Sequence, residues 1–187
     1  MKKLLAILLV PVLAGCLSSN PPEVSFWPLE YKGSEKQSVE AKYGVVRVSQ
    51  VLVRTPYNSP EITVLRADGS MAFDAYNEYA AVPSSLLKGV LVQALQASGL
   101  FKAVVNASSS VHSSASAEMF VTRLALDCRT KGERYAVAEL QLRIVGEGDE
   151  IRIVKGEGRE NAADGNYGAA FSRAVTVALG SALGDLR

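Results

Sequence analysis

Three consecutive runs of alternating apolar residues constrain the fold of this chain more than any other feature of its sequence. They cover residues 118–128, 135–145 and 151–157. The first run alternates at Phe120, Thr122, Leu124, Leu126 and Cys128, and the second at Ala136, Ala138, Leu140, Leu142 and Ile144. A period of two predicts strands with one buried and one wet face. The three runs therefore predict an antiparallel meander that needs a second layer to cover its apolar face.

Two segments with apolar residues at helical spacing supply that second layer. The first starts at Pro83, and Gly99 is placed to end it in a left-handed cap. Its apolar positions are Leu87, Val90, Leu91, Ala94 and Leu95. The second spans about residues 165–186, and its stripe consists of Phe171, Val175, Ala178, Leu179, Ala182 and Leu186. Both stripes are expected to face a sheet.

The other apolar segments predict further strands. Residues 43–53 are rich in valine, and residues 61–66 and 70–76 flank Asp68-Gly69, a pair that suits a hairpin turn. A short strand is predicted over residues 100–105, and the serine-rich residues 107–117 predict a loop. Two helices on one face of a mixed sheet bury both stripes. We therefore predict an α+β fold, a two-layer sandwich of a mixed, mostly antiparallel sheet with two helices packed on one face.

The N-terminus has the parts of a secretory signal. Lys2 and Lys3 precede an apolar run of about ten residues, roughly half the length of a membrane-spanning helix. The run ends in Leu13-Ala14-Gly15-Cys16. This tetrapeptide resembles the bacterial lipobox, in which the cysteine is lipidated and the chain is cut just before it. We predict that residues 1–15 are a signal peptide and that Cys16 carries covalent diacylglyceryl and N-acyl lipid.

Lipidation at Cys16 predicts where the protein works. Each buried acyl methylene contributes about 0.8 kcal/mol to membrane anchoring. Residue 17 is leucine rather than aspartate, which by resemblance to sorted lipoproteins favours the periplasmic face of the outer membrane. Residues 16–42 are predicted to be the lipidated N-terminus and a flexible tether, whose apolar residues 26–29 and Tyr31 are candidates to dock as an extended strand. Residues 43–187 then form a single periplasmic α+β domain.

The composition argues against several classes of protein. Loss of Lys2 and Lys3 with the signal brings the formal charge from +1 to about −1, so no nucleic-acid partner is expected. With Cys16 lipidated, Cys128 has no cysteine partner, and we interpret it as a small buried apolar residue. The single histidine, His112, lies in the serine-rich segment without a rigid orienting partner. We predict no metal site, no cofactor besides the lipid, no catalytic residues and no enzymatic activity.

One group of aromatic residues predicts an interaction surface. Phe73, Tyr76 and Tyr79 lie between the hairpin and the first helix, and Trp27 and Tyr31 lie in the tether. Aromatic side chains are enriched at protein interfaces. Packing at the sheet edge is the alternative explanation for the group. If the group is an interface, a homo-oligomer is one assembly it would support.

The motifs along the mature chain, taken together, resemble a known family. The lipobox cysteine is followed by Phe26-Trp27-Pro28-Leu29, a valine-rich strand, and Glu61-Ile62-Thr63-Val64. Then come Tyr76-Asn77-Glu78-Tyr79-Ala80-Ala81-Val82-Pro83, Leu86-Leu87 and Gly99-Leu100-Phe101. This pattern is similar to the auxiliary lipoprotein component of ABC-type transporters, the family of the paraquat-inducible intermembrane transport lipoproteins. The family usually has tryptophan where Tyr79 stands.

The resemblance implies a two-layer fold and a non-enzymatic accessory role. The partners it implies are ABC transporter components and lipid carriers of the mammalian-cell-entry type. On this hypothesis the lipid holds the domain at the outer membrane, where it docks a periplasm-spanning lipid carrier and contributes to envelope integrity. The alternative is a regulatory or assembly lipoprotein that binds an envelope enzyme or an outer-membrane barrel. An envelope hydrolase would have to use His112 for histidine-based chemistry.

Overall fold

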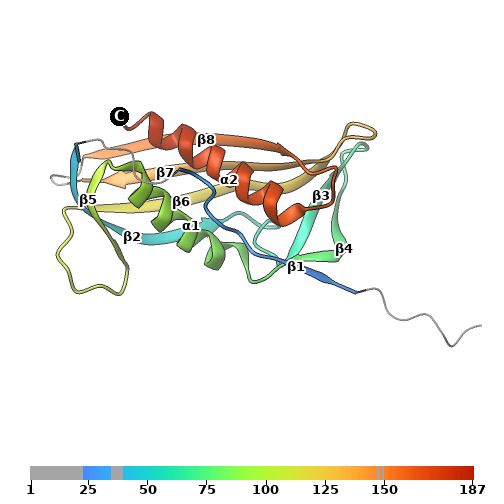
Figure 1. The fold of residues 1–187 in the computed structure, drawn as a ribbon, viewed down its shortest axis with the longest axis horizontal. Coiled ribbons are helices and arrows are strands. Elements are labelled where there is room, and N and C mark those ends of the chain that lie inside the picture. The colour runs from blue at the N-terminus through green and yellow to red at the C-terminus, as the bar shows by residue number, and fades with distance from the viewer. Residues whose placement is uncertain (1–22, 35–39, 147, 149) are drawn as a thin grey trace, which may run out of the picture.

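The computed structural model describes residues 23–34, 40–146, 148 and 150–187, and these residues form a sheet covered by helices on one face (Figure 1). The predicted signal peptide and Cys16 lie outside the described residues. In chain order the elements are β1 (Ser25–Trp27), β2 (Tyr43–Val53), β3 (Glu61–Arg66), β4 (Met71–Tyr79), α1 (Pro83–Ser98), β5 (Phe101–Asn106), β6 (Ala115–Cys128), β7 (Tyr135–Val145), β8 (Ile151–Asn161) and α2 (Tyr167–Gly184). Neither helix of this described part is long and apolar enough to cross a membrane.

The sheet is organised around β6, which is paired along both edges. On one edge β7 and then β8 follow antiparallel, so the predicted meander is confirmed. The other edge is shared by β2 and β3, which both run parallel to β6. β5 extends the sheet beyond β2, and β4 and β1 extend it beyond β3. The predicted α+β class is confirmed. The four parallel pairs among the described strands, β2 and β3 with β6, β5 with β2 and β1 with β4, are an addition to the prediction.

A bulge in β6 changes which side chains face the helices. Val121 pairs with Leu140 and Arg123 with Glu139, so Thr122 is an extra residue in β6. Before the bulge Phe120 is exposed, whereas after it the even-numbered residues 124 and 126 are buried in the core. The prediction that Phe120, Thr122 and Leu124 share one face is therefore wrong, because one inserted residue reverses the alternation.

β2 contains a matching bulge at Ser49. Val48 pairs with Ala117 and Gln50 with Glu118, so Ser49 has no register partner in β6. Its Oγ donates a hydrogen bond to the Ala117 carbonyl oxygen at 3.1 Å. The Thr122 Oγ1 in the β6 bulge likewise donates to a carbonyl oxygen of the neighbouring strand, at 3.2 Å. A hydroxyl side chain thus compensates for the disturbed ladder at both bulges.

The helices cover one face of the sheet, with α1 over β2 and β5 and α2 over β7 and β8. Every residue of the two predicted helical stripes is buried. Gly99 ends α1 with a left-handed φ of 68°, as predicted. α2 starts two residues later than predicted because Gly165 has a turn conformation with φ of 78° and the Asn166 side chain caps the helix. The helical stripes and the inner side of the sheet form the main core.

The serine-rich segment is shorter than predicted and is bound by Arg47. The sequence predicts that residues 115–117 belong to the loop, but they are part of β6 because they pair with β2. The Arg47 guanidinium donates hydrogen bonds to the carbonyl oxygens of Ser109 and Val111, both at 2.6 Å, and of Ala107 at 3.2 Å. Hydrogen bonds from this one arginine on β2 therefore hold the backbone of residues 107–111 in place.

Two glycines allow α2 to approach β8 closely. A Cβ atom at Gly158 would lie 1.9 Å from the Ala174 carbonyl oxygen, and one at Gly156 would lie 1.8 Å from the Ala178 carbonyl oxygen. Both oxygens belong to the backbone of α2, so neither can rotate away. The sequence predicts a strand that ends at residue 157, but β8 continues to Asn161 against β7. Gly156 and Gly158 therefore lie inside β8, where the absence of a side chain lets α2 pack directly against the strand.

We expect Gly158→Ala to lower the free energy of unfolding by about 3 kcal/mol, because the added methyl forces α2 away from the sheet. Gly89→Ala in α1 is the matched control, since a Cβ there meets no atom within 4 Å. The control should raise the free energy of unfolding by about 0.5–1 kcal/mol through helix propensity. Urea unfolding followed by circular dichroism measures both changes. Equal stability of the two variants would contradict the close approach.

Candidate functional site

Residues 25–32, here called the N-terminal strap, run from the sheet edge across the helical layer between α1 and α2 (Figure 1). The strap begins as β1, which pairs in parallel with β4. Further along, the backbone N–H groups of Glu30 and Lys32 donate to Ser172 Oγ at 3.0 Å and to Thr176 Oγ1 at 2.9 Å. Leu29 is buried in the main core. The expected docking is confirmed, although strand pairing is limited to Ser25–Trp27 and the rest of the strap packs on α2 without it. This docked segment interrupts the predicted tether of residues 16–42.

Trp27 fastens the strap at its start. Its Nε1 donates to Asn77 Oδ1 at 2.9 Å, and its ring lies edge-on to Tyr167 with 6.4 Å between ring centroids. The ring also covers Gly168, where a Cβ would lie 2.9 Å from it. The Trp27 carbonyl oxygen accepts a hydrogen bond from the Ala80 N–H at 2.9 Å. Both the side chain and the backbone of Trp27 therefore hold β1 on the domain.

The structure does not gather the five predicted aromatic residues into one surface. Tyr79 is 2% exposed and lies edge-on to Phe171, and burial raises its pKa well above the ordinary value. Trp27 and Tyr31 are half-buried and pack against the core. Phe73 and Tyr76 are exposed on β4. Only these last two side chains are free to meet a partner, and the interface itself stays a prediction.

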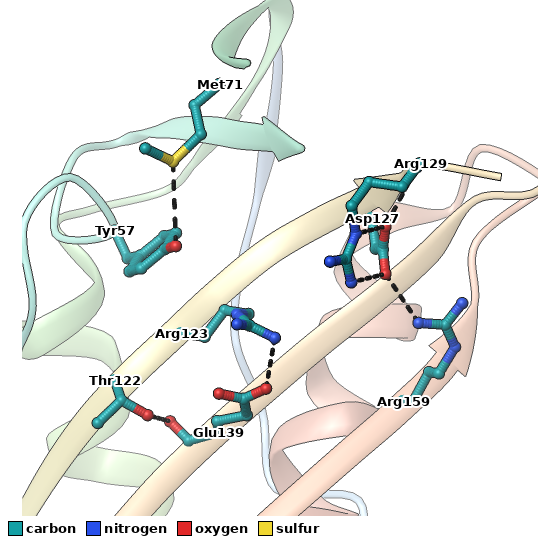
Figure 2. Close-up of polar contacts among 8 residues, drawn as sticks. All are labelled: Tyr57, Met71, Thr122, Arg123, Asp127, Arg129, Glu139 and Arg159. Carbon is teal, nitrogen blue, oxygen red and sulfur yellow. Dashed lines mark hydrogen bonds and ion pairs between the residues drawn. The ribbon is translucent and has the colours of Figure 1, made fainter. Parts of the chain in front are cut away.

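The sheet face turned away from the helices, here called the open face, carries a polar cluster beside the β6 bulge (Figure 2). Asp127 is 4% exposed and accepts hydrogen bonds from Arg129 Nε and Nη2, each at 2.9 Å. Arg159 Nη1 on β8 donates to the same carboxylate at 2.8 Å. These hydrogen bonds hold the Asp127 pKa well below its usual range, although burial raises it. The Arg129 side chain has the largest effect, and the Arg129 backbone N–H and the Arg159 side chain follow.

Neighbouring contacts extend this cluster along the open face. Arg123 Nη1 pairs with Glu139 Oε1 at 2.6 Å, and the Arg159 guanidinium lies 3.9 Å from the Tyr135 ring centroid. At the β3–β4 side the Tyr57 hydroxyl lies 4.0 Å from the Met71 sulfur (Figure 2). The arginines line a surface hollow of about 230 Å³. Since the Asp127 and Glu139 carboxylates are both ion-paired, the arrangement suits cross-strand stabilisation better than proton transfer.

The residues considered for catalysis or metal binding lie apart. In the described part of the chain, no three His, Cys, Asp or Glu side chains are placed to hold a metal ion. His112 is exposed in the loop between β5 and β6. Cys128 is half-buried against the main core, and burial raises the pKa of its thiol. Cys128 therefore lies at the edge of the core and is less buried than its interpretation as a small buried apolar residue expects.

Four exposed apolar residues lie on the open face in two pairs, Leu52 with Phe120 and Ile151 with Ile153, and the polar β7 residues Gln141 and Arg143 lie between the pairs. The open-face patch consists of Leu52, Phe120, Ile151 and Ile153, which are 40–60% exposed. Leu52 lies directly opposite Phe120 across β2 and β6. Ile151 and Ile153 lie on β8, on the side opposite the glycines that contact α2. The sequence offers one signal for these residues. In β2 and β8, apolar residues occur at both odd and even positions, a pattern that indicates a strand with apolar side chains on both faces.

We expect Asp127→Asn to lower the free energy of unfolding at neutral pH by about 2 kcal/mol, because two arginines lose a buried anionic partner. The folded-state pKa is depressed, so the carboxylate stabilises the fold above its unfolded-state pKa of about 4 and loses this effect as pH falls further. The difference between wild type and variant should therefore shrink below about pH 4. Urea unfolding at several pH values measures it.

Glu150→Gln is the control for this prediction. Glu150 pairs with Arg152 at 2.9 Å, but its side chain is 63% exposed. Loss of an exposed ion pair should change the free energy of unfolding by less than about 0.5 kcal/mol. If both substitutions destabilise the protein equally, or if the effect of Asp127→Asn does not depend on pH, the buried pair has no special role.

Comparisons with known proteins show similarity in fold only. No family model matches the chain, and no curated protein matches it. A Xanthomonas campestris protein assigned to the DUF330 family superposes with a TM-score of 0.64 at 18% identity, covering 87% of this chain and 97% of that chain. A second, uncharacterised protein has a TM-score of 0.51 at 15% identity, covering 82% and 98%. PelC of Paraburkholderia phytofirmans, crystallised as a dodecamer, is more distant, with a TM-score of 0.43 at 9% identity and coverage of 85% and 92%.

Proposed function

We propose that this chain is a lipid-anchored accessory lipoprotein of an intermembrane lipid-transport system and that its domain docks a partner rather than catalysing a reaction. The observation that carries the proposal is the arrangement of anchor, strap and domain. The lipobox cysteine stands seven residues before Glu23, where the described chain begins, and the chain then enters the strap. A lipid on Cys16 would therefore hold the whole domain at the periplasmic face of the outer membrane.

The motifs that carry the family resemblance have a common structural role, which supports the proposal. The residues 26–29 form part of β1 and the strap, and the motif at residues 76–83 forms the end of β4 and the start of α1. These two segments pair with each other, with Trp27 opposite Tyr79. Two motifs about 50 residues apart in sequence thus pack together and fix the start of the strap to the domain. Such a fixed N-terminal segment fits a family of proteins that are anchored at the N-terminus.

The open-face patch is the surface we propose for the partner. The strap already lies on the helical layer, whereas the patch side chains are exposed on the other side of the sheet. Exposed apolar patches on otherwise polar surfaces mark protein interaction sites. The ion pair of Arg143 with Glu118 at 3.1 Å lies between the two apolar pairs of the patch and would supply the polar contacts that interfaces usually combine with apolar ones. We propose a lipid carrier of the mammalian-cell-entry type, with ABC transporter components, as the partner.

We expect Phe120→Glu to abolish function without unfolding the protein, because Phe120 is 40% exposed and the new charge replaces the apolar partner of Leu52 in the patch. The assay is complementation of a deletion strain, read as sensitivity to detergents and membrane-active compounds. Val177→Glu is the matched control, since Val177 is an apolar residue of α2 that is 47% exposed on the opposite layer. Phe120→Glu should fail to restore the barrier, and Val177→Glu should restore it.

Cross-linking identifies the partner. A photoreactive residue at position 52, next to Phe120, should capture a transport component in cells, and one at position 177 should not. Capture of a cell-wall synthase or an assembly barrel would favour the regulatory alternative. Normal barrier function with Phe120→Glu would contradict the assignment of the open face, and an unchanged barrier in the deletion strain would contradict the transport role.

A further inference from the structure

The distance from the anchor to the domain is short, and this limits how the domain can sit on the membrane. From Cys16 to Glu23 the chain spans seven residues, so their Cα atoms are at most about 25 Å apart. By comparison β6, with 14 residues, is about 46 Å long. The β1 end of the domain must therefore stay near the bilayer. This step rests on the lipidation at Cys16 that the proposed function assumes.

Exposed apolar side chains surround the place where the chain enters the domain. We call this place the β1 corner and define it by Phe26, Tyr76 and Val82, which are 61%, 52% and 42% exposed. Phe26 lies in β1 itself. Tyr76 lies in β4 next to Asn77, the register partner of Ser25. Val82 lies two residues after Ala80, whose N–H donates a hydrogen bond to a carbonyl oxygen of β1. The corner and the loop between β5 and β6 lie at opposite ends of the long axis (Figure 1).

The charges at the β1 corner indicate what kind of surface it fits. Residues 23–29 and 71–83 contain the acidic residues Glu23, Asp74 and Glu78 but no lysine or arginine. Attraction to anionic lipid headgroups is therefore not the driving force. Aromatic side chains are favoured in the interfacial region of a bilayer, at the level of the lipid headgroups. A contact too weak to bind alone becomes effective when an anchor keeps it at high local concentration.

We propose that the β1 corner rests on the bilayer surface, with Phe26 and Tyr76 in its interfacial region. The domain then stands with the β5–β6 loop pointing away from the membrane. The lipid anchor supplies the affinity, and the corner supplies the orientation. The open-face patch is thereby held at a fixed height and angle for the partner.

Site-specific fluorescence in vesicles tests this orientation. The full lipidated protein, with Cys128→Ser, carries an environment-sensitive dye at Ser25→Cys, Ala81→Cys or Ser110→Cys. All three positions are exposed, and Ser110 lies in the distant loop. The vesicles contain phosphatidylethanolamine, phosphatidylglycerol and a lipid that quenches the dye. Flotation and intact mass establish anchoring and lipidation in each sample.

We expect a blue shift and quenching by lipid at positions 25 and 81 but not at 110, unchanged at high salt. The double substitution Phe26→Ser and Tyr76→Ser should remove the quenching at position 81, while the protein still floats with the vesicles. Equal quenching at all three positions, loss of quenching in salt, or quenching that survives the double substitution would overturn the proposal. A blue shift without lipid quenching would indicate self-association instead. A protein that does not float contradicts the lipidation, and with it the proposed function.

Discussion

Docking of the N-terminal strap on α2 is the contact on which the rest of the account depends, because it fixes the N-terminal segment of the described chain to the domain. Two strap amides bond to the hydroxyls of Ser172 and Thr176, and Leu29 is buried beneath them. If Cys16 carries a lipid, as we propose, at most about 25 Å of chain separates the anchor from Glu23. Because the strap is docked, the β1 end of the domain would then stay near the membrane.

Tyr79 links the strap to the core. It lies opposite Trp27 in register, and its ring packs edge-on against Phe171 of α2. Its hydroxyl has no hydrogen-bond partner among the described residues. A buried hydroxyl without a partner is costly, so the site suits a purely aromatic surface better than a phenol. The role of Tyr79 therefore lies in the packing of its ring against Phe171 and not in its hydroxyl.

The sequence predicts those parts of the fold whose signal is local. The bounds of β7 are as predicted because its alternation is uninterrupted, and both helices follow from their stripes and Gly99. The bulges at Ser49 and Thr122 leave no local signal, since one extra residue changes the phase but not the composition. The parallel pairing of β2 and β3 with β6 joins distant segments. The Asp127 cluster was missed for the same reason, although a charged residue inside the apolar run of β6 was a visible hint.

Hydrogen exchange of the strap amides, measured by NMR on the domain, tests the central claim most directly. If the strap is docked as described, the N–H groups of Glu30 and Lys32 exchange slowly, with protection comparable to that of amides within α2. If they exchange at the rate of an unstructured peptide while α2 remains protected, the strap is not fixed to the domain. In that case the anchor would not set the orientation of the sheet.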